Sequence, residues 1–413
     1  MAGYLDLDRT LTPEQVTLRK EVHRFAEEVL RPASVELDRL ADPEDVVKRD
    51  SIFWDVFRKF YEQGYHTRTL PEGLGGTGLS VEEQCIVTEE LGWGSADFAI
   101  GLGVTSFPFL FAAGTGNPEI MNDVVRPFLE DREARYVGCW AITEPHHGSD
   151  TLAAGTEGFR DPNVFYEVTA RADGDEWVIN GQKAAWVSNG TIATHALTFL
   201  GIEDKKGMGM AGGGVALIPL GLPGISRGRA LDKLGQRALN QGEIFFDGAR
   251  IPRHYMIVGP EGYQMVLEGV LAGANAYMGI TFAGLARAAF EEALAYTKQR
   301  VQGGRPICEH QLVQKKLFDM FIKVQAARDL ARSTLIYNSS GPSAALQCSI
   351  ASKVFCTTVA FEVASDAVQL FGGYGLAKGV LVEKLLRDAR ASMIEDGSND
   401  LLSLVGARKI IDG

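Results

Sequence analysis

The chain has 413 residues, more than single hydrophobic cores usually reach, so we expect two or three packed subdomains. Hydrophobic residues make up 46% of the chain and charged residues 23%, which is typical of a folded globular protein rather than a disordered one. The net charge of -12 is spread along the chain without any Lys/Arg-rich run, so nucleic acid is not expected as a partner.

The first third of the chain has helical periodicity. Thr12, Pro13 and Gln15 are typical of the start of a helix, and Pro32 is expected to end it. A second helix is predicted over residues 52–63, and Ser80 with Glu83 indicates a capping box that opens a third. We therefore expect residues 1–135 to form a helical N-terminal domain.

From Tyr136 the pattern changes to alternating apolar and polar residues. The stretch "VFYEVTARADGDEWVINGQKAAWVSN" alternates and is interrupted by Asp-Gly and Asn-Gly, both strong hairpin signals. Two more strands are predicted over 215–220 and 242–252. Residues 136–252 are therefore expected to form an antiparallel β-domain.

Helical periodicity returns after Pro252. Helices are predicted near 262–300, 310–338, 343–371, 378–390 and 399–411, which together would form a helical bundle over 253–413. The order α, then β, then α predicts an α+β multidomain protein and excludes a repeating βαβ fold.

The five cysteines are odd in number and include no CxxC pair, so we expect reduced thiols rather than a disulfide frame or a zinc site. The N-terminal segment lacks the basic start and apolar core of a signal peptide, and no run of eighteen uninterrupted apolar residues occurs. These features predict a cytoplasmic protein without a membrane span.

The glycine-rich stretch "LPEGLGGTGLS" invites a phosphate-binding interpretation. No strand precedes it, and its glycine spacing fits neither a P-loop nor the GxGxxG pattern. We therefore favour an ordinary loop.

Two short stretches of the β-domain are candidates for a binding site. "CWAITEPHHGSD", residues 139–150, is predicted to be a strand that opens into a loop with hydroxyl groups and backbone N–H groups, which would suit a polar heterocycle or an anion; a plain surface turn is the alternative. Adjacent His146 and His147 should point apart, so no metal site is expected. In "INGQKAAWVSNG", Trp186 and Ser188 are expected on one face of a strand, where they would wall a flat ring or simply pack.

Read together, these stretches and others resemble the acyl-CoA dehydrogenase family of flavoproteins from residue 10 to residue 411. The similarity lies in seven stretches in the family's order and spacing: "TPEQ", "LPEGLGGTGLS", "AITEPHHGSD", "VINGQKAAWVSN", "LGQRALNQGEIFFDGARIP", "RVQGGRPICEHQLVQKKLFDM" and "AVQLFGGYGLAKGVLVEKLLRDAR". The resemblance implies a helical N-terminal domain, a middle antiparallel β-barrel and a C-terminal four-helix bundle. It also implies FAD as cofactor, an acyl-CoA substrate, an electron-transferring flavoprotein as electron acceptor and a homotetramer, with a dimer as the alternative.

The resemblance also implies which residues bind FAD. Those expected at the flavin are Ile142, Thr143, Ser149, Trp186 and Ser188, with Ser398 from the last turn before the final helix. Those expected at the diphosphate and adenosine end are Arg300 and Gln311, offered by a neighbouring subunit, and Gln369, Gly372 and Gly373. One departure is Gly303, which replaces the phenylalanine usual three residues after this arginine.

The catalytic base implied by the family register is Asp396. Many members carry a Glu-Gly-Thr turn here, which falls on Asp396, Gly397 and Ser398, while Glu395 occupies the preceding, non-catalytic position. A subgroup places its base on the long helix, in a register that falls on Ala274, which cannot act as one. Without the resemblance, both acids read as exposed residues at a helix N-terminus.

An aspartate in place of glutamate is the second departure. One methylene shorter, it would sit about 1.5 Å further back, which suits a bulkier α-carbon, so a branched or cyclic acyl group is a hypothesis. Burial in a closed pocket should raise its pKa toward a useful range. Residues that could shape the acyl pocket, or pack in the core, are Phe107, Phe109, Tyr277, Met278, Tyr374 and Leu376.

Two other functions remain open from the sequence. A flavin oxidase resembling the nitroalkane oxidases would use an aspartate at this place, but those also rely on an arginine soon after it, and residues 397–407 contain none. A non-catalytic FAD- or CoA-binding family member is the third alternative.

Overall fold

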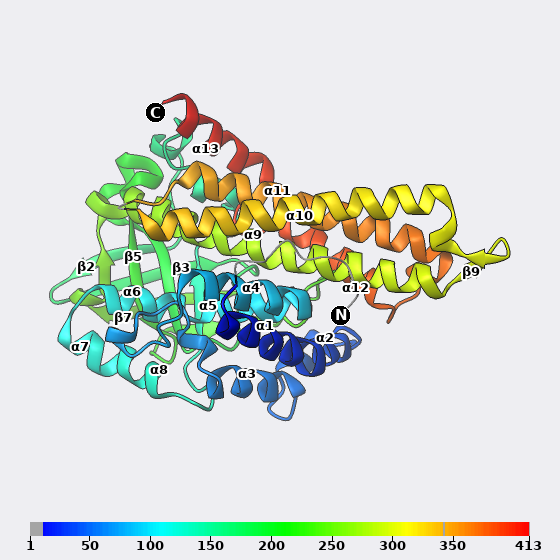
Figure 1. Cartoon of the computed structure of the whole chain (residues 1–413). Helices are drawn as coiled ribbons and strands as arrows, with labels where there is room; N and C mark the ends of the chain where they lie inside the picture. The colour runs from blue at the N-terminus through cyan, green and yellow to red at the C-terminus, as the bar shows by residue number, and fades with distance from the viewer. Residues whose placement is uncertain (1–10, 342, 413) are drawn as a thin grey trace.

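The computed structural model describes residues 11–341 and 343–412 of the chain. Helices come first, a sheet follows, and a set of long helices completes the chain, which is the predicted α, β, α order. Figure 1 shows the sheet at one end of the long helices and the short β9–β10 hairpin at the other. Residues 1–10, where the predicted N-terminal domain begins, lie outside the described residues.

The first helix, α1 (Pro13–Phe25), begins as predicted, because the Thr12 side chain and the Gln15 side chain cap each other's backbone. Its predicted end at Pro32 is wrong. A π-turn (Ala26–Leu30) leads directly into α2 (Arg31–Asp38), in which Pro32 stands in the first turn. A first-turn proline costs little where the π-turn has already displaced the regular hydrogen-bond ladder.

The remaining N-terminal helices wrap one side of the long helices. They are α3 (Ile52–Glu62), α4 (Val81–Gly94), α5 (Ala96–Thr105), α6 (Phe107–Gly114), α7 (Pro118–Ile120) and α8 (Arg126–Glu130). The predicted capping box of Ser80 and Glu83 opens α4. Helix α4 is buried along most of its length and packs against the first long helix, α9 (Pro260–Gln299), which joins the two helical regions into one core.

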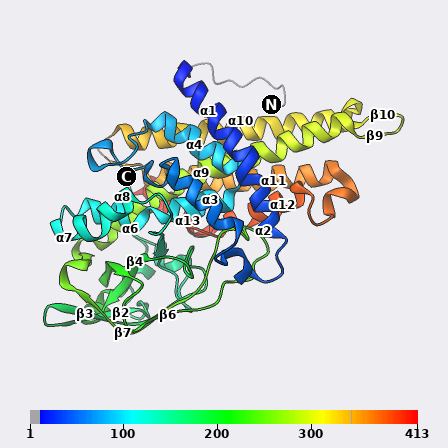
Figure 2. The ribbon, with the colours of Figure 1, turned by 90° about the horizontal axis from the view of Figure 1, so that it is seen from below.

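The middle region forms a mixed sheet. Its strands are β1 (Gly138–Ala141), β2 (Thr169–Asp173), β3 (Glu176–Lys183), β4 (His195–Ile202), β5 (Gly213–Pro219), β6 (Ile225–Arg227), β7 (Ile244–Pro252) and β8 (Met256–Val258). The order is β6-β7-β3-β2-β4-β5-β8, with β1 on β4. Figure 2 shows β2, β3, β6 and β7 grouped on the side away from α1 and α10 (Gln311–Ser340).

The prediction of a closed antiparallel barrel is corrected in two respects. Within the described residues the two end strands, β6 and β8, do not pair with each other, so the sheet is open. Strand β4 also has two parallel neighbours along the same edge: β1 pairs with its first half and β2 with its last two residues. All of β4 is buried, as expected for a strand covered on both faces. Strand β8 lies beyond the predicted boundary at residue 252.

The two hairpin signals have different outcomes. Asp173 pairs with Glu176 across a two-residue turn, which confirms the Asp-Gly hairpin between β2 and β3. The Asn180–Gly181 pair forms no turn and lies inside β3, where the register against β7 shifts. Gly181 has φ +123°, and a Cβ there would lie 2.7 Å from the Glu167 carbonyl oxygen, so this glycine serves a bulge.

All five predicted C-terminal helices are present, as α9, α10, α11 (Leu346–Phe371), α12 (Leu381–Ser392) and α13 (Asn399–Ile411). Helices α9, α10 and α11 pack on one another, and α12 packs on α11 and α9. Between α9 and α10, β9 (Val301–Gln302) and β10 (Arg305–Pro306) form a hairpin. Its turn residues Gly303 and Gly304 have φ +64° and +81°, which explains why no phenylalanine stands at position 303.

Three helical stretches are long and apolar enough to cross a membrane by length and composition: Ala96–Gly114, Pro260–Gln299 and Leu346–Leu376. The most apolar windows of the first two are 78% and 83% buried inside the protein, so their apolar character supplies the core. The window of the third is only 39% buried. The expectation that no segment spans a membrane stays a prediction.

The five cysteines are free thiols, as expected. Cys85, Cys139 and Cys356 are buried, Cys308 is half-buried and Cys348 is exposed. Burial raises the pKa of the Cys139 and Cys356 thiols to about 12, so both remain protonated and behave as core residues.

Candidate active site

A cavity of about 210 Å³ lies between α4, α5, α6 and α9 and the turn before α13. Its walls are mainly apolar and include Ile100, Val104, Phe107, Phe111, Val270 and Met278. Three glycines open the space, because a Cβ at Gly103, Gly269 or Gly273 would meet no atom within 4 Å. A glycine inside a helix costs about 1 kcal/mol relative to alanine, so all three positions favour room over helix stability.

One carboxylate, that of Asp396, lines this cavity. Asp396 has φ +53° and Gly397 has φ +95°, so the turn between α12 and α13 runs through two successive left-handed residues. Asp tolerates this conformation better than most non-glycine residues do. Ala274, the alternative family position for a base, lines the same cavity.

The turn that carries Asp396 is held from three sides. Lys353 of α11 donates from Nζ to the Gly397 carbonyl oxygen at 2.7 Å and to Asn399 Oδ1 at 2.8 Å. The Ser398 hydroxyl caps α13 by accepting from the Leu401 N–H. The Ser398 N–H donates to Ser149 Oγ at 3.0 Å, so two of the residues predicted at the flavin meet. These contacts fix the residues that directly follow Asp396 in the turn.

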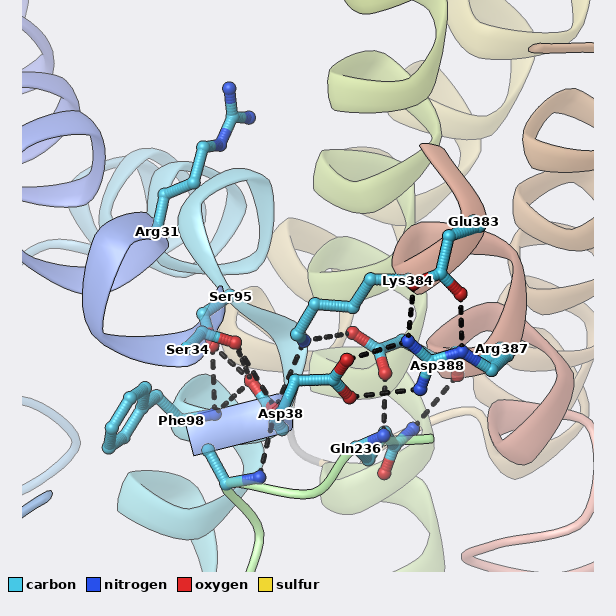
Figure 3. A network of polar contacts seen from close by, with 12 residues as sticks. Arg31, Ser34, Asp38, Ser95, Phe98, Gln236, Glu383, Lys384, Arg387 and Asp388 are labelled. Carbon is cyan, nitrogen blue, oxygen red and sulfur yellow. Dashed lines mark hydrogen bonds and ion pairs between the residues drawn. The ribbon is translucent and has the colours of Figure 1, made fainter. Parts of the chain in front are cut away.

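Glu395 faces a different environment. Its Oε1 accepts from Gln236 Nε2 at 2.6 Å, and the same amide also donates to the Asp388 carbonyl oxygen. Behind them Lys384 lies between Asp97 and Asp388 and pairs with both, as Figure 3 shows for Lys384, Asp388 and Gln236. Glu395 therefore belongs to a polar network between α12 and the loop before β7, and does not line the cavity.

Both carboxylates have raised pKa values. Burial raises the pKa of Asp396 to about 6, and the positive charge of Lys353 limits the rise. Burial and the neighbouring Asp396 raise the pKa of Glu395 to about 7, against the hydrogen bond from Gln236. Burial lowers the pKa of Lys353 to about 8. The pKa values alone do not distinguish the two acids as candidate bases. Their positions do, because Asp396 lines the cavity whereas Glu395 is bonded to Gln236 in the polar network.

The first binding stretch follows β1. The buried Ile142 carbonyl accepts from Lys183 Nζ at 3.0 Å, and the Thr143 carbonyl accepts from the Ala184 N–H at 2.9 Å. Lys183 also forms a fully buried ion pair with Glu144. These contacts tie the end of β1 to the end of β3.

The loop after Glu144 is mostly satisfied internally. Glu144 and His147 exchange backbone hydrogen bonds, and the Gly148 N–H donates to Asp150, so fewer N–H groups are free than the sequence suggested. His146 contacts Glu167 and His147 contacts Asp150, so the two rings point to different partners, as predicted. No group of three or more potential metal ligands gathers within residues 11–341 and 343–412.

The prediction that Trp186 and Ser188 lie on one face of a strand is wrong. β3 ends at Lys183; Trp186 lies in the turn that follows, and Ser188 forms an isolated antiparallel β-bridge with Gln241. Gln241 fixes both, because its Nε2 donates to the Trp186 carbonyl at 3.2 Å and to Ser188 Oγ at 3.1 Å. Trp186 is 58% exposed, so its indole is not buried in the core of the chain.

The residues predicted at the diphosphate and adenosine end of FAD do not lie near the cavity. Arg300 ends α9, Gln311 begins α10, and Gln369, Gly372 and Gly373 end α11, all near the β9–β10 hairpin. Stacking of Tyr296 on Phe371, with ring centroids 3.9 Å apart, joins these helix ends. Figure 1 shows this hairpin at the opposite end of the long helices from the sheet. Within one chain, the residues predicted at the flavin are therefore separated from those predicted at the diphosphate and adenosine.

Several residues of the site escaped sequence reasoning. They are Arg68, Thr88, Gln236, Gln241, Lys353 and the three cavity glycines. Lys353 alone left a signal, as a lysine within the otherwise uncharged run "CSIASKVFCTTVAF". Of the residues considered for the acyl pocket, Phe107, Tyr277 and Met278 line the cavity.

The other three pocket candidates lie elsewhere. Phe109 stacks on Phe128 in the core. Tyr374 and Leu376 are exposed near the end of α11.

Comparison with known proteins identifies three domain families in order along the chain. Residues 12–137 match the acyl-CoA dehydrogenase N-terminal domain, residues 139–249 the middle domain and residues 261–411 the C-terminal domain.

Individual proteins match the chain over nearly its whole length. Benzylmalonyl-CoA dehydrogenase of Aromatoleum aromaticum is 31% identical, covering 98% of this chain and 100% of that protein. Cyclohexane-1-carbonyl-CoA dehydrogenase of Geobacter metallireducens is 30% identical, covering 97% and 98%.

Among solved structures, a chain of "Electron transferring flavoprotein of Acidaminococcus fermentans: Towards a mechanism of flavin-based electron bifurcation" superimposes with a TM-score of 0.84 and 27% identity, covering 98% of this chain and 100% of that one. With all three domains matched in order and relatives similar from end to end, the chain belongs to the acyl-CoA dehydrogenase family, flavoprotein oxidoreductases that act on acyl-CoA.

Proposed function

We propose that the protein catalyses FAD-dependent α,β-dehydrogenation of an acyl-CoA thioester to the enoyl-CoA, with Asp396 as the base that removes the α-proton. The observation that carries this proposal is the separation of the two adjacent acids. Asp396 lines the apolar cavity, whereas Glu395 is bonded to Gln236 outside it. A general base has to come within about 3 Å of the proton it takes, so only the cavity carboxylate can serve.

The chain offers groups that fit FAD. Trp186 presents an exposed indole, and hydroxyls of Thr143, Ser149 and Ser188 lie on the stretches around it. At the far end of the long helices the Arg300 side chain is exposed, and a Cβ at Gly372 or Gly373 would meet no atom within 4 Å, so a diphosphate can approach the backbone there. FAD, when bound, supplies the acceptor for the β-hydride.

The distance between the two groups supports an oligomeric site. Ile142, Thr143, Ser149, Trp186, Ser188 and Ser398 would contact the flavin, while Arg300, Gln311, Gln369, Gly372 and Gly373 would reach the diphosphate and adenosine of a neighbouring copy. Helix α10 supports association, because it exposes apolar side chains: Leu312, Phe318, Ile322 and Tyr337 are each more than half exposed. We propose a homotetramer, with a dimer as the alternative.

Asp396 is suited to proton transfer at neutral pH. With a pKa of about 6 it is mostly ionised there, yet a stronger base than an exposed aspartate. Lys353 holds the following carbonyl and so keeps the carboxylate from turning away from the cavity. The Asp396 N–H makes no hydrogen bond within the described residues, which leaves it free to donate to the thioester oxygen and acidify the α-proton.

The glycines of the cavity wall and the short Asp396 side chain support a bulky acyl group. Gly103, Gly269 and Gly273 widen the cavity, and the aspartate occupies less of it than a glutamate would. The relatives named for benzylmalonyl-CoA and cyclohexane-1-carbonyl-CoA support a branched or cyclic substrate. Family membership supports an electron-transferring flavoprotein as electron acceptor. A cytoplasmic location, with neither membrane nor nucleic acid as partner, remains part of the proposal.

The test is anaerobic bleaching of the flavin by linear, branched and cyclic acyl-CoAs. In Asp396→Asn, bleaching should slow by about 10²- to 10⁴-fold, the usual contribution of a general base. Glu395→Gln is the matched control and should bleach within a few-fold of wild type. The assignment of the base is wrong if Glu395→Gln is the variant that stops bleaching. Rapid production of hydrogen peroxide in air would indicate the oxidase instead.

A further inference from the structure

Arg68 lines the cavity and has no acidic partner among the described residues. It follows the short helix Tyr65–Thr67 and is only 4% exposed. Its Nη1 donates to the Tyr65 carbonyl at 3.1 Å, while its Nε is buried without a hydrogen-bond partner. The other deeply buried arginines, Arg287 and Arg328, both pair with Glu89. Arg68 is thus a buried cation without a counterion, facing a space large enough for a ligand.

A second unpartnered polar group lines the same cavity. The Thr88 hydroxyl of α4 is buried and makes no hydrogen bond within the described residues. Tyr277 of α9 also lines the cavity, and its hydroxyl donates to Gln84, which leaves the phenolic oxygen as an acceptor only. Buried polar groups are hydrogen-bonded in most proteins, so two unpaired donors on one apolar cavity point to a ligand that accepts from both.

Arg68, which follows the helix Tyr65–Thr67, and Asp396, in the turn between α12 and α13, reach the cavity from different elements. The positive charge that lowers the pKa of Asp396 is that of Lys353. The groups that favour the charged form of Arg68, against the effect of burial, are Tyr277 and Tyr65. An arginine keeps its proton even when buried, so the cavity is lined by one cationic group, Arg68, and one anionic group, Asp396.

We infer that the acyl group of the substrate carries a second carboxylate, remote from the thioester, that binds Arg68 and accepts from the Thr88 hydroxyl. This inference rests on the proposed function and names its substrate class, a dicarboxylic acyl-CoA. The guanidinium would neutralise the remote carboxylate, while Asp396 would repel it from the reacting carbons, so only one orientation of the acyl group is favourable. The reaction itself is unchanged: a proton leaves the α-carbon, a hydride leaves the β-carbon, and the remote carboxylate is retained.

The experiment compares two acyl-CoAs of matched length and shape, one ending in a carboxylate and one in a methyl group. The measured quantity is the ratio of kcat/KM for the two in flavin bleaching. Wild type should prefer the carboxylate, and in Arg68→Met the ratio should fall by about 10- to 100-fold, as expected when a hydrogen-bonded charge pair is lost. Arg68→Lys should retain part of the preference. Lys48→Met, which removes an exposed charge outside the proposed binding and association surfaces, should leave the ratio unchanged.

Folding defects are separated from specificity by using the ratio and by a second variant, Thr88→Val, which should lower the ratio in the same direction while keeping the shape of the side chain. A wild type that bleaches equally well with both thioesters, or prefers the methyl end, overturns the inference and leaves the dehydrogenase function intact. A ratio that is the same in Arg68→Met as in wild type also overturns it. If no acyl-CoA of either kind bleaches the flavin, it is the proposed function that fails.

Discussion

Replacing Lys353 by Met should move the pH dependence of α-proton removal upward. Lys353 Nζ bonds to the carbonyl of the residue after Asp396, so the two charges are close, and this lysine is the group that restrains the rise of the Asp396 pKa. At a separation on the order of 7 Å and an effective dielectric constant of about 20, one charge pair contributes about 2 kcal/mol. This corresponds to roughly 1.5 pKa units.

The proposed base, Asp396, acts only when ionised, so the rate of α-proton removal should fall as the pH drops through its pKa. The acidic limb should lie near the pKa of about 6 in wild type and between roughly 7 and 8 in Lys353→Met. At pH 7 the variant should therefore bleach the flavin roughly fourfold more slowly for this reason alone, and it should recover at higher pH. Stopped-flow bleaching from pH 5 to pH 9 measures the limb.

Lys48→Met serves as the control for the loss of a single exposed charge and should leave the acidic limb in place. An acidic limb of Lys353→Met at the wild-type position would refute the electrostatic reasoning. If the acidic limb of the pH–rate profile disappears in Glu395→Gln and keeps its wild-type position in Lys353→Met, the ionisation that controls bleaching is that of Glu395.

Three further predictions concern stability and cofactor binding. Folding raises the pKa of Asp396, so the folded state favours the protonated carboxyl group and is destabilised when Asp396 ionises. The stability gained from the protonated form is fully present below pH 4 and is lost as the pH rises through about 6. Asp396→Asn should therefore be more stable than wild type at pH 7, by roughly 1–3 kcal/mol, and equal to it near pH 4, in denaturant titrations. Glu89→Gln should cost about 3–5 kcal/mol, because it removes the buried anion that Arg287, Arg328 and Arg332 all contact, whereas Lys48→Ala, at an exposed ion pair, should cost less than about 0.5 kcal/mol; equal midpoints would contradict this. Trp186→Ala should weaken FAD retention by roughly tenfold, in dialysis followed by absorbance, if the exposed indole stacks on the flavin.

Short-range signals in the sequence were sufficient for most elements. The capping boxes at Thr12 and Ser80 and the turn after Asp173 depend on contacts within a few residues, so the sequence predicts them and the structure confirms them. Periodicity likewise predicted the five C-terminal helices. Family register pointed to Asp396, which is found at the cavity.

Tertiary structure decided what depends on distant partners. The Asn180–Gly181 pair looks like a turn locally, but pairing with β7 makes it a bulge, and a π-turn carries the first helix past Pro32. Glu395 and Asp396 are neighbours with similarly raised pKa values, and it is Gln236, Lys353 and the cavity wall that give them different surroundings.

Arg68 shows this limit most clearly. In the sequence "GYHTRTLP" it is an ordinary arginine in a loop, with nothing to mark it for binding. Packing of α4, α5 and α9 around it removes water and provides no carboxylate in return within the described residues. The sequence by itself therefore determines the elements, the family and the proposed base. The unpaired charge at the cavity wall exists only because the fold buries the Arg68 guanidinium without an acidic partner among the described residues.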